Sequence, residues 1–529
     1  MSIKQKIMLG EKIIHSKHLI DKIENIQLSV SSFFYTFLSI VIIRTCFEFL
    51  LEPSQSVTLF DSLYYSLIDY IHIFLSWLSL FFWIVLWLKL IYKRNIFKII
   101  NIVLIAFPII CIVPIIDYIF YSGIEISYKY NFTSFLSTYI NLFNPFYIVP
   151  HISTGVRIEV ALVLIMAILY GLIQKQSFLK IFLATIGIYT IIFFFGYLPA
   201  VYIFFLEIDF FTILSNSLLI EKSNMHLHAM MYISLLFLQV GLFLLLLPKN
   251  VIQSLIYIVR FERLMIYIGI FLFSVTIGLK QSFVGVEIFN FYDINKLLSA
   301  MLSIIFAFMY STVINDISDE KADCISNPKR VLVQKLLSKI SFTQLGNIFL
   351  FFSIIFAILV NQHFIFLIIA ILALSYIYSN PPFHLKRFFL LSHLTLTLIV
   401  GLIVVLGFCF VEANLAFKKI DIVFLNAVTM FYFVASHFKD IKDTDADKAF
   451  KTITLATIIG KEKAFIILNI LVFVCIIYIS IWMLQMSFFI SFFTGLCFLY
   501  ISYFMKNSEK SILITQAIGF ILLLSYITT

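Results

Sequence analysis

Charged residues are scarce in this chain. Only 12% of its 529 residues are Asp, Glu, Lys or Arg, whereas a soluble domain carries about 25%. Hydrophobic residues make up 62% of the chain. Such a chain has too few polar residues to cover its surface in water. The composition also excludes a disordered, collagen-like or disulfide-rich secreted protein. We therefore expect an all-α protein that crosses a membrane many times.

Cysteine pairs, alternating apolar patterns and a leader segment are also missing. The six cysteines are scattered without a CxxC pair, so we interpret them as packing residues rather than redox or metal groups. The apolar runs are continuous, which argues against a transmembrane β-barrel. The first thirty residues are Lys-rich without a following apolar core, so we expect no cleavable signal peptide. Their apolar spacing predicts an amphipathic helix on the membrane surface, with a solvated basic tail as the alternative.

Apolar runs of the length needed to cross a membrane recur along the whole chain. A span needs about 20 mainly apolar residues, and the runs predict about fifteen transmembrane helices. The six in the first module cover residues 33–51, 64–91, 99–121, 156–174, 181–206 and 227–247. The nine in the second cover residues 262–280, 297–315, 343–360, 363–379, 389–411, 421–438, 464–484, 486–505 and 511–528. We therefore predict a six-helix module over residues 1–250, of unknown role, and a nine-helix module over residues 255–529.

The basic residues indicate how these helices are oriented. If the Lys-rich N-terminus lies in the cytoplasm, Lys and Arg are concentrated in every second loop, as the positive-inside rule requires. This places the C-terminus outside and predicts an integral protein of the cell membrane. The net charge of +9 is then explained by inner loops at an anionic lipid surface, and no nucleic-acid partner is expected.

Acidic residues gather in two short segments. Eight of the 28 Asp and Glu residues fall in residues 315–323, the first acidic segment, and residues 439–447, the second acidic segment. Each follows a predicted span on its cytoplasmic side. In each, three aspartates are spaced i, i+3, i+7. These six residues are Asp316, Asp319, Asp323, Asp440, Asp443 and Asp447.

This spacing places three carboxylates on one stripe of a helix. Like charges on one stripe repel each other, more strongly near a membrane than in water, and a divalent cation would relieve the repulsion. Carboxylates without His or Cys favour Mg²⁺, which proteins hold with a few carboxylates and substrate phosphate oxygens. One such segment alone could be a solvated helix end, but the repeated spacing favours a metal site. An EF-hand is excluded because Lys448 and Thr454 replace its Gly and Glu.

Basic and polar residues accompany the acids. Arg and Lys suit a diphosphate, as a planar fork and a point charge, although any one of them could simply be part of the topology signal. The candidate diphosphate-binding residues are Asn315, Arg330, Tyr378, Lys386, Arg387 and Lys439.

Together, residues 315–330, 378–387 and 439–447 resemble the UbiA superfamily of intramembrane prenyltransferases. The resemblance covers about residues 255–529. It implies a nine-helix bundle with one acidic motif after its second helix and the other after its sixth. It also implies that the six aspartates bind metal and are catalytic, and that the accompanying polar residues bind diphosphate. His384 departs from the family, which often has Arg there.

The resemblance implies Mg²⁺-dependent transfer of an isoprenoid chain from a prenyl diphosphate to a small or lipidic acceptor, within lipid or quinone biosynthesis. The donor length and the acceptor stay open. One alternative is a terpene cyclase on the same scaffold, which needs no separate acceptor. The non-enzymatic alternative is a transporter. Transporters place charges near the midplane on broken helices, whereas these acids follow the cytoplasmic ends of spans.

Overall fold

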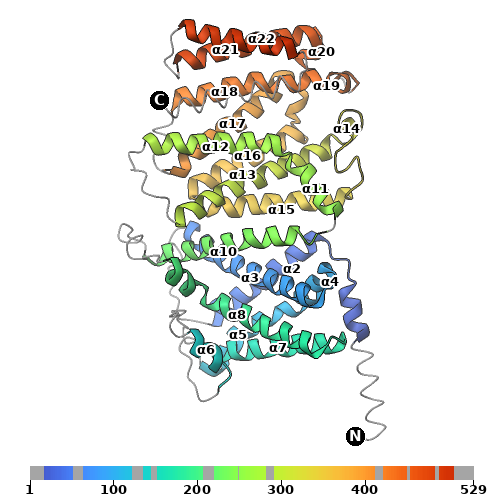
Figure 1. Ribbon diagram of the computed structural model, residues 1–529, viewed down its shortest axis with the longest axis vertical. Helices are drawn as coiled ribbons and strands as arrows, with labels where there is room; N and C mark the ends of the chain where they lie inside the picture. Colours follow the sequence, from blue (N-terminus) through green and yellow to red (C-terminus); the bar gives the residue numbers. More distant parts are fainter. Residues whose placement is uncertain are drawn as a thin grey trace. The chain divides into compact units, whose positions relative to one another are not determined.

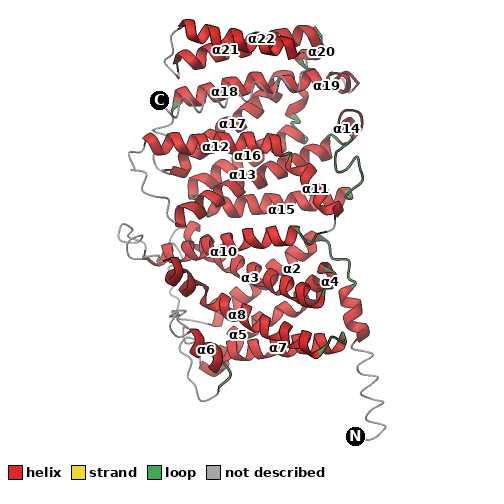
Figure 2. Cartoon of the chain, in the orientation of Figure 1, coloured by secondary structure: helices red, strands yellow, loops and turns green. Residues whose placement is uncertain are grey.

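The computed structural model describes most of the chain as helix. It describes residues 17–51, 63–121, 135–144, 152–206, 220–247, 249–281, 291–411, 421–449, 453–482 and 488–505. All regular structure in these ranges is helical (Figure 2). Twelve of the described helical segments are long and apolar enough to cross a membrane. The predicted class, an all-α integral membrane protein, is confirmed.

The predicted number of spans is not confirmed in full. Twelve of the predicted spans coincide with the twelve candidate segments. The sixth falls on α10 (Ile220–Leu244), whose apolar part is shorter, Met231–Leu244. The fourteenth falls on α22 (Phe488–Met505), which is helical but is not among the twelve. The fifteenth, residues 511–528, lies outside the described residues.

The chain divides into two compact units, Met1–Pro248 and Lys249–Thr529. Besides α10, the N-terminal unit contains α2 (Val30–Leu51), α3 (Leu63–Tyr92), α4 (Ile96–Ala106), η1 (Phe107–Cys111), α5 (Ile112–Tyr121), α6 (Phe135–Asn141), α7 (Thr154–Ile173) and α8 (Phe178–Leu206). Helix α3 packs against α4, α8 and α10. Pro108 and Pro114 interrupt the helical hydrogen bonding, so α4, η1 and α5 form one bent span.

Two buried or half-buried acidic side chains of the N-terminal unit have hydrogen-bonding partners. Residues 17–24 are helical, within the segment predicted to be amphipathic, and the buried Glu24 accepts hydrogen bonds from Arg94 at 2.6 Å, Gln174 at 2.8 Å and Tyr170 at 3.0 Å. Within α2, Arg44 pairs with Glu48 at 2.7 Å. Because buried charges are costly unless they are paired, these contacts serve first to satisfy buried charges, and those of Glu24 also link separate segments of the unit.

The C-terminal unit begins with α11 (Lys249–Val259) and α12 (Phe261–Gln281). Besides α22, it continues with α13 (Phe291–Ser318), α14 (Glu320–Ser326), α15 (Lys339–Ile358), α16 (Gln362–Ser379), η3 (Leu385–Arg387), α17 (Phe389–Val411), α18 (Ile422–Ser436), α19 (Phe438–Ala449), α20 (Leu455–Ile459) and α21 (Lys461–Trp482). Its main apolar core lies among α12, α13, α15, α16, α17 and α18.

Small residues allow the helices of this unit to pack closely. A Cβ atom at Gly407 on α17 would lie 2.9 Å from the carbonyl oxygen of Phe271 on α12, so a larger residue would force the two helices apart. Between α13 and α15, Ser303 and Ser353 each donate to the other's carbonyl oxygen, at 2.8 and 2.9 Å. Small side chains and interhelical hydrogen bonds of this kind are what hold helices together in lipid. Close packing of this kind fixes the positions of α12 and α17, and of α13 and α15, relative to each other.

Candidate functional site

The two acidic segments lie at the same end of the C-terminal unit. The first follows α13, its second membrane-spanning helix, and the second follows α18, its sixth. Helix α14 packs against α19 at this end (Figure 1). The structure therefore brings together two segments that are more than a hundred residues apart in the sequence.

The first acidic segment keeps its helical register through a short interruption. Asp319 separates α13 from α14. Its N–H still donates to the carbonyl oxygen of Asn315 at 2.9 Å, and its own carbonyl oxygen accepts from the N–H of Asp323 at 2.8 Å. The backbone hydrogen bonding thus continues across the junction, and Asp316 and Asp319 both lie within electrostatic range of Asp323.

Two arginines reach the buried carboxylates of this segment. Asp316 and Asp323 are only 2% and 5% exposed. Arg260, at the junction of α11 and α12, forms an ion pair with Asp316. The Nε atom of Arg330 lies 3.9 Å from Oδ1 of Asp316 and 3.8 Å from Oδ2 of Asp323. One guanidinium thus lies between two carboxylates.

The third carboxylate of the segment has a lysine as its partner. Nζ of Lys386, in η3, donates to Oδ1 of Asp319 at 2.6 Å. Its neighbour Arg387 is exposed, so η3 directs only one of these two predicted residues toward the acids. The hydroxyl of Ser318 donates to the carbonyl oxygen of Ser379 at 2.8 Å, which ties the end of α13 to the end of α16.

Burial shifts the titration of these groups. Desolvation raises the pKa of Asp323, and the nearby Arg330 partly offsets the rise. Desolvation lowers the pKa of Arg260 to about 10, although Asp316 opposes the shift. It also lowers the pKa of Lys386, against the effect of Asp319. Each shift is what burial of a charged group produces, so the groups offset one another's desolvation through ion pairs.

The second acidic segment begins at a helix discontinuity that His437 creates. Nδ1 of His437 donates to the carbonyl oxygen of Phe433 at 2.8 Å. Its backbone N–H bonds instead to the carbonyl oxygen of Val434 at 3.2 Å. The hydrogen bonds therefore shift from i−4 to i−3 at this point, α18 ends, and α19 begins with Phe438.

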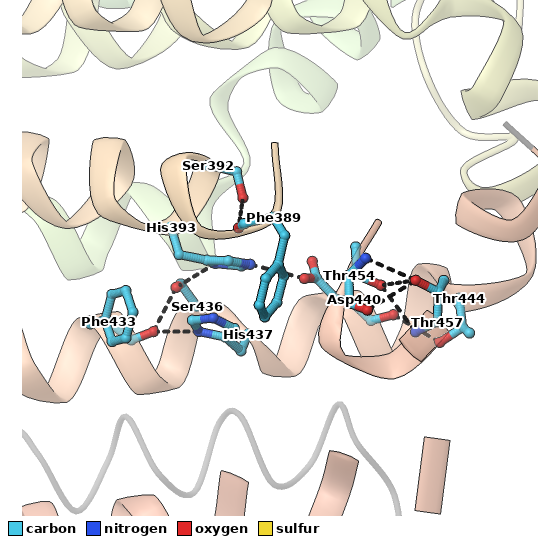
Figure 3. Close-up of polar contacts among 10 residues, drawn as sticks. All are labelled: Phe389, Ser392, His393, Phe433, Ser436, His437, Asp440, Thr444, Thr454 and Thr457. Carbon is cyan, nitrogen blue, oxygen red and sulfur yellow. Dashed lines mark hydrogen bonds and ion pairs between the residues drawn. The ribbon is translucent and has the colours of Figure 1, made fainter. Parts of the chain in front are cut away.

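Asp440 is held by a histidine from another helix. Oδ2 of Asp440 lies 2.9 Å from Nε2 of His393 on α17, and Nδ1 of that ring lies 2.8 Å from Oγ of Ser436. Figure 3 shows the His393 ring between the serine and the aspartate. The ring of His437 stacks on it, with 3.5 Å between ring centroids.

The remaining predicted residues are less directly engaged. Tyr378, near the end of α16, lies within electrostatic range of both Asp440 and Asp319. Asn315 is half-buried in α13, and Lys439 is exposed on α19. Asp443 and Asp447 lie on α19, but their side chains are outside the described part of the structure. Among the side chains that are described, no three His, Cys, Asp or Glu groups are close enough to share a metal ion.

Two residues of this constellation were missed by the sequence analysis. Arg260 lies 56 positions before its partner Asp316, outside both acidic segments. His393 lies 47 positions before Asp440, inside an apolar run. The signal that could have marked His393 is an ionisable residue within a span.

The donor set suits a hard divalent cation. The described groups are carboxylate oxygens, which Mg²⁺ prefers. Oδ2 of Asp323 is buried and receives no hydrogen bond from the described residues, its nearest basic partner being Arg330 at 3.8 Å. A buried carboxylate oxygen without a donor is costly, and a cation beside it would remove that cost. The residues present therefore fit a bound metal.

Comparison with known proteins places the C-terminal unit. Residues 271–523 match the model of the UbiA prenyltransferase family. The C-terminal unit belongs to the UbiA prenyltransferase family. The predicted resemblance is thus confirmed for this half of the chain, and no family model matches the N-terminal unit.

Individual UbiA relatives match parts of the chain. A homogentisate phytyltransferase from Synechocystis is 36% identical over 110 residues, which are 20% of this chain and 36% of that protein. The alignment thus spans about a third of that relative's length. A UbiA homolog from Archaeoglobus fulgidus bound to GPP and Mg²⁺ has a TM-score of 0.38 and 17% identity, over 52% of this chain and 100% of its own. A UbiA homolog from Aeropyrum pernix has a TM-score of 0.41 and 15% identity, over 50% and 97%.

Proposed function

We propose that the C-terminal unit transfers an isoprenoid chain from a prenyl diphosphate to an acceptor within the membrane, with Mg²⁺ as cofactor. The observation that carries the proposal is the convergence of the two acidic segments with Arg260, Arg330 and Lys386 at one end of the bundle. Membership of a prenyltransferase family supports the same reaction.

The carboxylates of both segments are the proposed metal ligands. Asp316, Asp319 and Asp323 would act from the α13–α14 junction, and Asp440, Asp443 and Asp447 from α19. When bound, Mg²⁺ supplies positive charge that stabilises the leaving diphosphate. Because Mg²⁺ is usually held by a few carboxylates together with phosphate oxygens, these aspartates would hold it together with the diphosphate of the donor.

The basic side chains have the second role. Arg260, Arg330 and Lys386 already lie beside the carboxylates, so a diphosphate bound there meets both signs of charge. The C1–O bond of the donor breaks, and the electron pair leaves with the diphosphate. These preorganised cations stabilise the developing charge. The acceptor's nucleophile forms the new bond to C1 and releases a proton.

The apolar helices below the site would hold the prenyl tail. Tyr267 and Tyr432 hydrogen-bond to each other at 2.9 Å, and Tyr267 packs on Phe308 with 5.4 Å between ring centroids. Aromatic faces stabilise a nearby cation, which suits a reaction in which C1 becomes positive. We further propose that this end of the bundle faces the cytoplasm, because Lys and Arg are concentrated in its loops.

The test is turnover by the purified full-length protein in lipid nanodiscs. Labelled geranyl, geranylgeranyl and phytyl diphosphates are supplied with and without candidate acceptors, and products are identified by mass spectrometry. Homogentisate is one acceptor to include, since the Synechocystis relative is a homogentisate phytyltransferase. We expect prenylated acceptor and diphosphate in equal amounts.

Asp316→Asn and Glu320→Gln form the matched pair for this assay. Glu320 lies in the same segment, but its side chain is 42% exposed and pairs with Lys339 at 2.9 Å on the surface. We expect Asp316→Asn to lower turnover about 100-fold or more and Glu320→Gln to keep it. If a cyclised product formed without any acceptor, the reaction would be cyclisation rather than transfer. Equal turnover by Asp316→Asn and the wild type would refute the proposed site.

A further inference from the structure

The carboxylate of Asp440 contacts the ring of His393, which stacks on the ring of His437. His393 is only 3% exposed, and its Nε2 lies 2.9 Å from Oδ2 of Asp440. An ionised carboxylate can only accept hydrogen bonds, so Nε2 carries a proton and donates it. This contact joins α17 to α19, two elements on either side of α18 in the sequence.

The second nitrogen of the His393 ring is also held by a neighbouring side chain. Nδ1 of His393 lies 2.8 Å from Oγ of Ser436. The hydroxyl of Ser436 itself donates to the carbonyl oxygen of Phe433 at 2.8 Å, so the serine that contacts Nδ1 is fixed in place. Asp316 and Asp319 instead pair with basic side chains, those of Arg260 and Lys386.

Stacking fixes the plane of the His393 ring. The His437 ring lies on it at an interplanar angle of 19°, and the edges of Phe433 and Phe389 pack against His437. Nδ1 of His437 is itself bonded to the carbonyl oxygen of Phe433. Neither ring can turn without losing a buried hydrogen bond, so the direction of the Nε2–H bond is set before any ligand arrives.

We propose that His393 is a positioning residue that holds the Asp440 carboxylate in the orientation in which it binds the divalent cation. The inference rests on the proposed function, because it assumes that Asp440 is a metal ligand. It extends that function by assigning a role to a histidine inside a membrane span. Residues that orient metal ligands in this way typically contribute about 10- to 100-fold in metal affinity or activity.

The experiment measures Mn²⁺ binding to the purified full-length protein by electron paramagnetic resonance, without any substrate. His393→Phe keeps a ring for the stack but lacks the donor. His393→Gln keeps an N–H that can reach the carboxylate. We expect His393→Phe to weaken Mn²⁺ binding about 10- to 100-fold and His393→Gln to restore most of the affinity. His363→Gln, at the start of α16 in the same unit, is the matched control and should bind as the wild type does.

A kinetic measurement separates positioning from general packing. His393→Phe should raise the Mg²⁺ concentration needed for half-maximal turnover, with the KM for prenyl diphosphate unchanged at saturating Mg²⁺. If His393 had a merely structural role, His393→Phe and His393→Gln would weaken Mn²⁺ binding equally. This result would overturn the inference. So would wild-type Mn²⁺ affinity in His393→Phe.

Asp440→Asn distinguishes failure of this inference from failure of the proposed function. If Asp440→Asn loses Mn²⁺ binding while His393→Phe keeps it, only the role of His393 is wrong. If Asp440→Asn and the wild type bind Mn²⁺ equally, or the wild type binds none, the metal site itself is wrong and the role of His393 falls with it.

Discussion

The two acidic segments have the same aspartate spacing, yet the structure surrounds them differently. In the first, Asp316 and Asp319 each pair with a basic side chain, that of Arg260 and that of Lys386. In the second, Asp440 meets the imidazole of His393, which stacks on His437. The difference teaches that equal spacing does not imply equal roles. The first segment is paired with the groups that would hold a diphosphate, whereas the described carboxylate of the second is held by a histidine.

Removal of divalent cations should have the largest effect, because it acts on both segments at once. With EDTA in excess, we expect no diphosphate release from a prenyl diphosphate, since the charge on the leaving group is then unscreened. Added Mg²⁺ should restore release to the original rate. The measurement is a continuous diphosphate assay on the nanodisc-reconstituted protein. Full activity in EDTA would show that Arg260, Arg330 and Lys386 suffice without a metal.

Substitution of Arg260 should affect the first segment alone. Arg260→Gln removes a buried cation beside Asp316, so we expect the KM for prenyl diphosphate to rise about 10- to 100-fold, as for loss of a charge-assisted contact. Arg260→Lys keeps the charge without the fork and should be intermediate. Steady-state kinetics at saturating Mg²⁺ measure both. If Arg260→Gln instead weakened only Mg²⁺ dependence, the two segments would not differ as described.

Substitution at the surface of the first segment should have the smallest effect. Glu320 and Lys339 form a pair whose side chains are 42% and 57% exposed. Such surface pairs contribute about 0–1 kcal/mol. Glu320→Gln should therefore leave turnover unchanged and should shift the unfolding temperature by no more than a few degrees. Thermal unfolding and turnover in nanodiscs check this. A large loss of turnover would extend the site to the exposed side of α14.

Much of the fold follows from the sequence because burial in lipid imposes a simple rule. Every backbone polar group must be paired inside its own helix, so continuous apolar runs such as residues 389–411 predict α17 with the bounds that the structure shows. The rule is weaker where polar residues enter a helix. Residues 227–247 were predicted as a span, but α10 begins at Ile220 and its apolar part is short.

Spacing alone predicts the candidate site only where its residues are close in the sequence. Asp316, Asp319 and Asp323 are local in sequence, so their spacing predicts their proximity. Arg260 and His393 come to the acids through tertiary packing, from 56 and 47 positions away. Helical periodicity carries no information about such contacts. The same limit applies to Lys386 and Arg387, which are adjacent in sequence although only Lys386 turns toward Asp319.

The central claim is that the two acidic segments act on one diphosphate. A double-mutant cycle of Asp316→Asn and Asp440→Asn, measured as diphosphate release, tests it most directly. We predict that each substitution lowers the rate of diphosphate release about 100-fold or more. The double variant should release diphosphate only slightly more slowly than the less active single variant, because the effects of groups that act as a unit are not additive. Losses that multiply in the double variant, or release at the wild-type rate in either single variant, would contradict the claim.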